Sequence, residues 1–76
     1  MVNPDLPLKI LLKSKGSKIG VRLKNGVEYQ GRLQQSDVYM NLILTDTEEI
    51  VHGEKKTKLG RAFLRGNNIL FIRILS

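Results

Sequence analysis

Regular alternation of apolar and polar residues in the first half of the chain sets its fold class. Over residues 18–24, and again over residues 27–34, apolar side chains alternate with polar or small ones. This period of two is typical of strands with one buried face. Asn25 and Gly26 separate the two runs, and Asn-Gly is the strongest short hairpin signal because both turn residues accept a positive φ. The sequence therefore predicts an antiparallel hairpin.

Further apolar runs predict three more strands, at residues 40–45, 59–64 and 69–75. Gly31 and Gly60 fall inside predicted strands, where glycine marks a bulge or a sharp bend. Strongly bent strands in so small a protein suggest a barrel. Before the first strand, leucines at helical spacing between Pro7 and Gly16 predict a short amphipathic helix over residues 7–15.

The segment between the third and fourth strands has a weaker pattern. Residues 48–51 either extend the third strand or form a separate one, and residues 52–58 are predicted to form a charged loop. After the fourth strand, residues 65–68 are predicted to form a tight turn, because glycine and asparagine tolerate the left-handed conformation.

The last run, residues 69–75, is apolar at every position except Arg73. Such a run is typical of a strand that is buried on both faces. A chain of 76 residues buries only about 60% of its unfolded surface, so it cannot cover both faces alone. A partner subunit is therefore expected.

Composition narrows the function. The chain carries 13 Lys and Arg against seven Asp and Glu, a net charge of +6, which suggests a nucleic-acid partner but also serves solubility. With no cysteine and one histidine, His52, neither a disulfide nor a metal site nor any other cofactor is expected. No apolar run approaches the roughly 20 residues that span a bilayer, and no signal peptide is evident. A single intracellular domain over residues 1–76 is expected.

Two polar turns are predicted to form one composite site. Residues 36–41 offer a carboxylate, a phenol and a carboxamide directly before apolar residues 42–44, so a buried strand anchors them. The second turn, residues 64–68, lies between two more apolar runs. Taken singly, each polar residue is better explained by turn capping or packing, but together they favour a binding site.

With these motifs the sequence resembles the Sm and Sm-like (LSm) family of RNA-binding ring proteins. The first Sm motif matches residues 18–44 and contains Asp37-Val-Tyr-Met-Asn41, and the second matches residues 59–69, with Leu64-Arg-Gly-Asn-Asn-Ile69. The resemblance implies a mainly β fold, in which a short N-terminal α-helix precedes a strongly bent five-stranded antiparallel SH3-like barrel, the Sm fold. It also implies a closed homo-oligomeric ring of about six to eight subunits, most often seven.

In that family the fourth strand of one subunit pairs with the fifth strand of the next, and the site on the inner rim of the pore binds uridine-rich single-stranded RNA. Carried over to this chain, Tyr39 would stack on a base, Asn41 would bind the Watson–Crick edge of uracil, and Arg65 would cover the other face of the base. Asp37 would orient Asn41 and Arg65, and Gly66 would let the backbone approach closely. Met40 and Asn67 are further candidates, Met40 more for packing than for contact.

Other functions are weighed against this one. The alternative is a ring that serves chiefly as a structural scaffold for proteins and touches RNA incidentally. An enzyme is not expected, because the sequence offers no nucleophile–base set, phosphate-binding loop or metal-ligand cluster. A monomeric single-strand binder would need more exposed aromatic residues than Tyr29 and Tyr39.

Two departures from the family pattern bear, the first on base stacking and its pH response, the second on the type of ring. Many archaeal members have histidine where Tyr39 stands, and the long tails of spliceosomal members are not found here. The chain is expected to be an archaeal-type homomeric subunit that acts in the cytoplasm in RNA processing, as an RNA chaperone or ribonucleoprotein scaffold. A eukaryotic paralogue would be nuclear.

Overall fold

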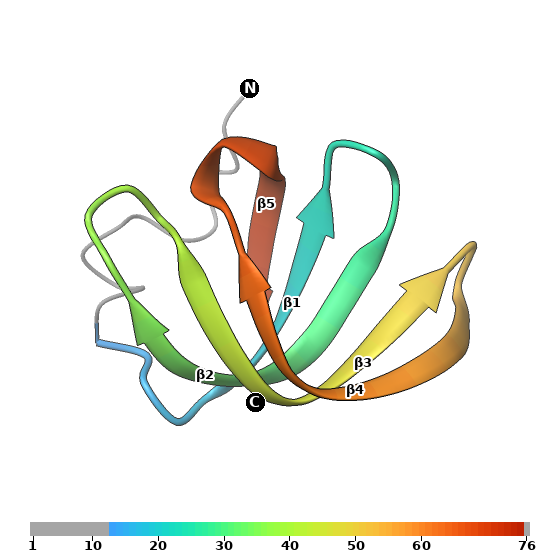
Figure 1. Cartoon of the computed structure of the whole chain (residues 1–76), viewed down its shortest axis with the longest axis horizontal. Helices are drawn as coiled ribbons and strands as arrows, with labels where there is room; N and C mark the ends of the chain where they lie inside the picture. Colours follow the sequence, from blue (N-terminus) through green and yellow to red (C-terminus); the bar gives the residue numbers. More distant parts are fainter. Residues whose placement is uncertain (1–12, 76) are drawn as a thin grey trace.

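A computed structural model describes residues 13–75 of the chain, apart from the side chain of Lys56. These residues form a five-stranded antiparallel sheet with the spatial order β4-β3-β2-β1-β5 (Figure 1). The strands are β1 (Lys18–Leu23), β2 (Glu28–Ser36), β3 (Leu42–Val51), β4 (Glu54–Leu64) and β5 (Ile69–Ile74), and a single turn of 3-10 helix, η1 (Gly66–Asn68), precedes β5. The first four strands each lie beside their sequence neighbours, whereas β5 returns to pair with β1.

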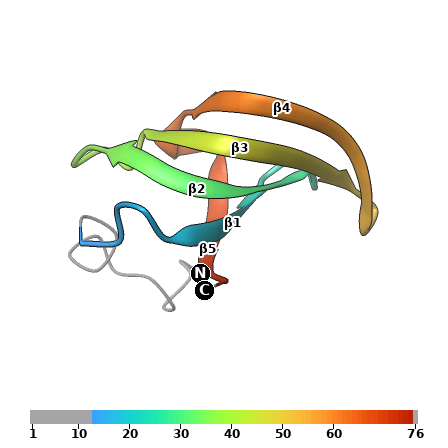
Figure 2. The ribbon, with the colours of Figure 1, turned by 90° about the horizontal axis from the view of Figure 1, so that it is seen from below.

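The mainly β, antiparallel prediction is confirmed, but the predicted barrel is wrong for the single chain. Closure would require β4 to pair with β5, and these two strands are the opposite edges of the sheet. Figure 2 shows β2, β3 and β4 as neighbouring curved strands of one open sheet. The predicted helix at residues 7–15 falls largely outside the described residues, and Lys13–Lys15, which are described, are not helical.

Two glycines allow the sheet to bend, as the sequence predicts. The pairing of β2 with β3 shifts register between Gln30 and Arg32, on either side of Gly31. A Cβ atom at Gly31 would lie 2.8 Å from the backbone oxygen of Thr45 and 3.1 Å from Oγ1 of Thr47, so any side chain would push β2 and β3 apart. On β4, Gly60 has a φ of 75° where the pairing with β3 is also irregular.

The bend wraps the sheet around one apolar core. Period-two alternation places the apolar residues of each strand on the inner face, which we call the core face. Its buried members are Ile19, Val21, Leu33, Leu42, Leu44, Leu64 and Ile72. The opposite side of the sheet, which carries the alternate residues, is called the outer face below.

The hairpin of β3 and β4 is longer than the sequence indicates. Residues 48–51 extend β3, and β4 begins at Glu54, so the charged loop predicted over residues 52–58 is wrong. The turn consists of His52 and Gly53, whose φ angles of 53° and 80° are those of a two-residue hairpin turn. An ion pair links the two strands here, with Lys55 Nζ 3.3 Å from Glu48 Oε1 on the paired strand. At its other end β3 begins at Leu42, so the predicted strand start at residue 40 is also wrong.

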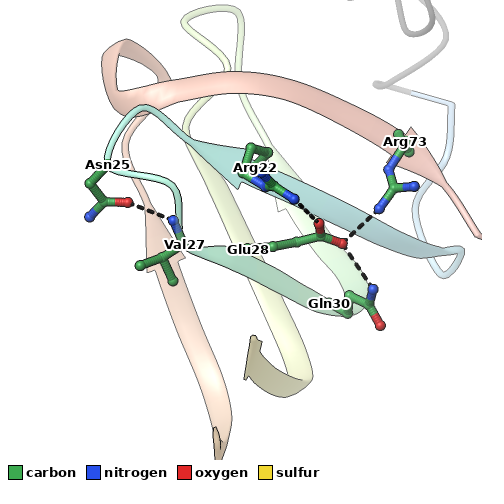
Figure 3. A network of polar contacts seen from close by, with 6 residues as sticks. All are labelled: Arg22, Asn25, Val27, Glu28, Gln30 and Arg73. Carbon is green, nitrogen blue, oxygen red and sulfur yellow. Dashed lines mark hydrogen bonds and ion pairs between the residues drawn. The ribbon is translucent and has the colours of Figure 1, made fainter. Parts of the chain in front are cut away.

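The first hairpin has a different turn from the one predicted. Of the Asn-Gly pair, Gly26 has a positive φ, 90°, while Asn25 does not. The Gly26 amide donates to the Leu23 carbonyl at 3.0 Å, which gives a three-residue loop with its last residue in the left-handed region. The Asn25 side chain accepts a hydrogen bond from the Val27 amide at 3.0 Å, which stabilises this conformation (Figure 3).

The close approach at Gly31 leads to a stability prediction. Gly31→Ala should lower the free energy of unfolding by about 1–3 kcal/mol, because the added methyl group must displace β3. Urea denaturation at fixed protein concentration measures the change. The control Gln34→Ala alters an exposed residue on the same strand and should stay within about 0.5 kcal/mol. A Gly31→Ala protein as stable as the wild type would contradict the packing argument.

Candidate functional site

The loop between β2 and β3 is held by the carboxylate of Asp37. Its Oδ1 accepts hydrogen bonds from the backbone amides of Tyr39, at 2.9 Å, and Asn41, at 3.0 Å. Its Oδ2 accepts a third, from the side-chain amide of Asn41, at 3.0 Å. Met40 takes a left-handed conformation with φ 64°, which reverses the chain. One carboxylate therefore sets both the shape of the loop and the orientation of Asn41.

Asn41 joins this loop to the second predicted turn. Its Oδ1 accepts a hydrogen bond from the Gly66 amide at 2.8 Å, across 25 positions of sequence. A Cβ atom at Gly66 would collide with the carbonyl oxygen of Tyr39, so the contact requires glycine. The two turns predicted to form one site are thus brought together, with Gly66 as the point of close approach.

The second turn differs in conformation from the one predicted. Residues Gly66–Asn68 form one turn of 3-10 helix, and none of residues 65–68 has a positive φ. Gly66 is therefore needed for its missing side chain and not for left-handed freedom. The Asn68 carbonyl accepts a hydrogen bond from the Lys24 amide at 2.9 Å, which ties the turn to the first hairpin.

Asn41 keeps spare hydrogen-bonding capacity. A carboxamide has two N–H donors and two acceptor lone pairs. The contacts with Asp37 and Gly66 use one donor and one lone pair and fix which end of the amide is oxygen. The remaining donor and lone pair, side by side on an exposed side chain, match the alternating donor and acceptor groups of a nucleobase edge.

The other predicted site residues differ in exposure. The Tyr39 side chain is 77% exposed, and Arg65 and Asn67 are exposed as well, whereas Met40 packs partly against the core. Asp37, Asn41 and Arg65 line a common open hollow together with Phe63 and Ile43 of the outer face. The predicted contact of Asp37 with Arg65 is not among the hydrogen bonds and ion pairs of the described residues, where Asp37 instead serves Tyr39 and Asn41.

The hydrogen bonds also shift the acidity of Asp37. Its pKa lies below the ordinary value, chiefly because the Asn41 side chain and backbone, and then the Tyr39 amide, donate to the ionised carboxylate. Protonation of this group would weaken three contacts at once. The loop is therefore most ordered when Asp37 is charged.

A polar network on the outer face was missed by sequence reasoning. Glu28 is only 4% exposed, and its carboxylate accepts from Arg22 at 3.2 Å, Gln30 at 2.9 Å and Arg73 at 2.8 Å (Figure 3). Burial raises its pKa, but the hydrogen bonds from Gln30 and Arg22 and the charge of Arg73 outweigh burial and leave the pKa below its ordinary value. The single charge in the otherwise apolar last run, Arg73, was the available signal.

Residues 13–75 hold no group of three or more His, Cys, Asp or Glu side chains arranged to bind a metal ion. Within the same range, we find no helix with the length and apolar character needed to cross a membrane.

Comparison with known proteins adds the family. The profile of the LSM domain matches residues 9–74. The chain belongs to the LSM domain family. The U6 snRNA-associated Sm-like protein LSm6 of Debaryomyces hansenii is 53% identical over 57 residues, which cover 75% of this chain and 67% of that protein. The family suggested by the two Sm motifs is thereby confirmed.

Solved structures of Sm proteins share this fold. The Sm protein of Pyrococcus abyssii, solved in complex with a uridine heptamer, aligns with a TM-score of 0.85 and 37% identity over 90% of this LSM chain and 96% of its own. A heptameric archaeal Sm protein aligns with a TM-score of 0.82 and 37% identity, over 90% and 98% of the two chains. All three relatives are named as Sm or snRNA-associated proteins, and none of them is named as an enzyme.

The acidity of Asp37 leads to a prediction for the loop. Because its folded pKa is lowered, its contacts are complete above the ordinary Asp pKa and are lost as the pH falls through the lower folded value. The backbone amide signals of Tyr39 and Asn41 should therefore move together in NMR spectra during acid titration, with a midpoint below that of an ordinary aspartate. Asp37→Asn is the control, since it should abolish this transition. An unchanged transition in that variant would assign it to another group.

Proposed function

We propose that this LSM protein binds uridine-rich single-stranded RNA at the inner rim of a ring. The observation that carries the proposal is the Asp37–Asn41–Gly66 junction, which holds a carboxamide with a free donor and acceptor between two exposed loops. Single-stranded RNA is read by stacking on aromatic or guanidinium planes together with hydrogen bonds to base edges. The related Pyrococcus abyssii Sm protein was solved with a uridine heptamer, which supports the choice of ligand.

Each side chain of the site has a role in this proposal. Asn41 binds the Watson–Crick edge of uracil, which offers both a carbonyl acceptor and an imide donor. Tyr39 stacks on one face of the base, and the guanidinium of Arg65 covers the other. Asp37 acts through Asn41, and Gly66 permits the close approach of the two loops.

One such site binds weakly, so repetition matters. Base–aromatic stacking contributes about 1–3 kcal/mol per base. A ring that presents the same site on every subunit gains avidity of about 10²–10⁴ where one strand reaches several sites. Affinity in this proposal therefore depends on assembly.

The two free edges of the sheet support assembly. Edge strand β4 exposes Phe63, at 71%, and Leu59, at 43%, while edge strand β5 exposes Leu70, at 48%, and Ile74, at 45%. Unpaired edges with exposed apolar side chains invite pairing with another chain. We propose that β4 of one subunit pairs with β5 of the next, and that this head-to-tail contact closes into a ring of about seven subunits. The apolar last strand is then covered as the sequence analysis expects.

The type of ring and its place in the cell belong to the same proposal. We infer a homomeric ring of archaeal type acting in RNA processing in the cytoplasm, in line with the archaeal Sm structures. The similarity to LSm6, a U6 snRNA-associated protein, supports the alternative of a eukaryotic nuclear ring shared with paralogues. Native mass spectrometry after co-purification from the source cells separates the two, since a homomeric ring contains one subunit mass.

Base recognition is tested by paired homopolymers. Wild-type protein should bind oligouridine far more tightly than oligocytidine, and Asn41→Ala should remove most of that difference, as measured by fluorescence anisotropy. Asn25→Ala removes a carboxamide from the first hairpin and should leave the preference intact.

Tyr39→Ala should weaken oligouridine binding about 5- to 150-fold through lost stacking, while Tyr39→Phe keeps the aromatic ring and should bind nearly as well. Equal binding of both homopolymers by the wild type would refute uracil recognition, and cellular RNA association that survives Tyr39→Ala and Arg65→Ala would favour a scaffold function.

Assembly through the sheet edges is tested by charge insertion. Phe63→Asp places an unpaired carboxylate on the β4 edge and should convert rings into smaller species in native mass spectrometry. Val38→Asp is the matched control, because Val38 is 64% exposed but lies in the β2–β3 loop and on neither edge strand. A wild-type protein that is monomeric at micromolar concentration would contradict the ring.

A further inference from the structure

The outer face of the sheet carries a cluster of basic groups. We propose that it binds the phosphate groups of a single-stranded RNA backbone, independently of sequence, and that Arg22 and Arg73 are the principal contacts. The choice of RNA as the ligand rests on the proposed function, while the existence of a phosphate site does not. These two arginines lie on β1 and β5, and the cluster shares no residue with the Asp37–Asn41–Gly66 junction.

Strand pairing gathers most of the excess charge of the chain on this face. Residues paired across strands point to the same side of a sheet. The rows through Arg32, Gln30 and Glu28 bring together six basic and two acidic side chains, so six minus two leaves four positive charges, against +6 for the whole chain. The basic members are Lys18, Arg22, Arg32, Lys55, Lys58 and Arg73, and the acidic ones are Glu28 and Glu48.

The two central arginines are held in place before any ligand arrives. Glu28, whose side chain is 6% exposed, binds Nη2 of Arg22 and Nη2 of Arg73 (Figure 3). Gly20 makes room for this arrangement, because a Cβ atom there would lie 3.0 Å from Glu28 Oε2 and 3.7 Å from Arg73 Nη2. Both guanidinium carbons also lie near the Phe71 ring, 5.8 and 6.0 Å from its centre. Such pre-organisation is what a binding site requires.

The network keeps donors and charge for a ligand. A guanidinium has five N–H groups, and the contacts with Glu28 use one nitrogen of each arginine. Nε of Arg22 is buried and out of a ligand's reach, so the donors left for a ligand lie on the accessible parts of the two side chains, which are 40% and 46% exposed. Two arginines against one carboxylate leave one positive charge, which one phosphodiester would balance. Guanidinium groups suit phosphate because paired N–H donors match its oxygens.

The lining of the face agrees with a polyanion. An open hollow is lined by Arg22, Glu28, Gln30, His52, Lys55 and Arg73, so the hairpin of β3 and β4 adds the charge of Lys55 to the arginine pair. Peptide partners are usually anchored by aromatic or aliphatic side chains in apolar pockets. At this site the aromatic ring of Phe71 already lies against both guanidinium groups. A regularly charged backbone therefore fits better than an acidic peptide.

The salt dependence of oligocytidine binding tests the proposal, because this probe carries phosphates but does not suit the uracil site. Arg22→Gln/Arg73→Gln should weaken binding and reduce the slope of log K against log salt concentration by about 0.7, as expected for one lost phosphate contact on a single strand. The control Lys13→Gln/Lys15→Gln removes the same charge from two exposed residues before β1 and should change the slope much less. Equal changes in the two double variants would show general attraction by net charge and overturn the site.

A charge-conserving variant covers the case in which the glutamine variant fails to fold. Arg22→Lys/Arg73→Lys keeps both charges but loses the forked donors, and a lysine cannot hold Glu28 and a phosphate with the same geometry. We expect folded rings with weaker oligocytidine binding. Wild-type affinity in this variant would overturn the assignment of the arginines.

Two readouts separate this inference from the proposed uracil site. The ratio of oligouridine to oligocytidine affinity should survive in Arg22→Gln/Arg73→Gln, whereas Asn41→Ala should lower the ratio and leave the salt slope unchanged. Competition against bound oligocytidine then identifies the ligand class. Inorganic polyphosphate should displace the probe, and oligoaspartate of equal charge should not. Equally effective displacement by oligoaspartate would assign the face to acidic peptides and overturn the RNA assignment.

Discussion

The contact on which the candidate site depends is the hydrogen bond from the Gly66 amide to the side chain of Asn41, supported from behind by Asp37. It joins segments 25 positions apart and fixes which atoms of the carboxamide remain free. The contact exists because Gly66 has no side chain to keep the loops apart. A single missing methyl group thus decides whether two ordinary turns become one surface for a nucleobase.

The bend of the sheet makes that contact reachable. Gly31 lets β2 pass close to β3, and the register shifts at this glycine and between Leu33 and Gln35 turn the sheet around its core. The bend does not close the sheet, so β4 and β5 remain separate edges with exposed apolar side chains. The junction forms within one chain, and in our proposal the open edges join neighbouring subunits into the ring.

The two carboxylates at the centre of the polar networks work in different surroundings. Asp37 is exposed and organises neutral amides, so its contribution depends on its own ionisation. Glu28 is buried and lies against two guanidinium groups, so it offsets charge as well as directing donors. The first arrangement suits recognition of a base edge, and the second suits neutralisation of a phosphate. Together they would let one small subunit bind the base and the phosphate of RNA at separate sites.

Local pattern was sufficient for the antiparallel strands, the bends at Gly31 and Gly60, the family and the joining of the two polar turns, because alternation, glycine and short motifs act over a few residues. Local pattern was not sufficient where the conformation depends on contacts between segments far apart in the sequence. Residues 54–58 of the predicted charged loop became strand because they pair with β3, and the sheet stayed open because β4 does not pair with β5 within one chain. The turn after β4 became 3-10 helix without a positive φ. The Glu28 network likewise depends on β1, β2 and β5 lying side by side, and no local window of sequence contains that arrangement.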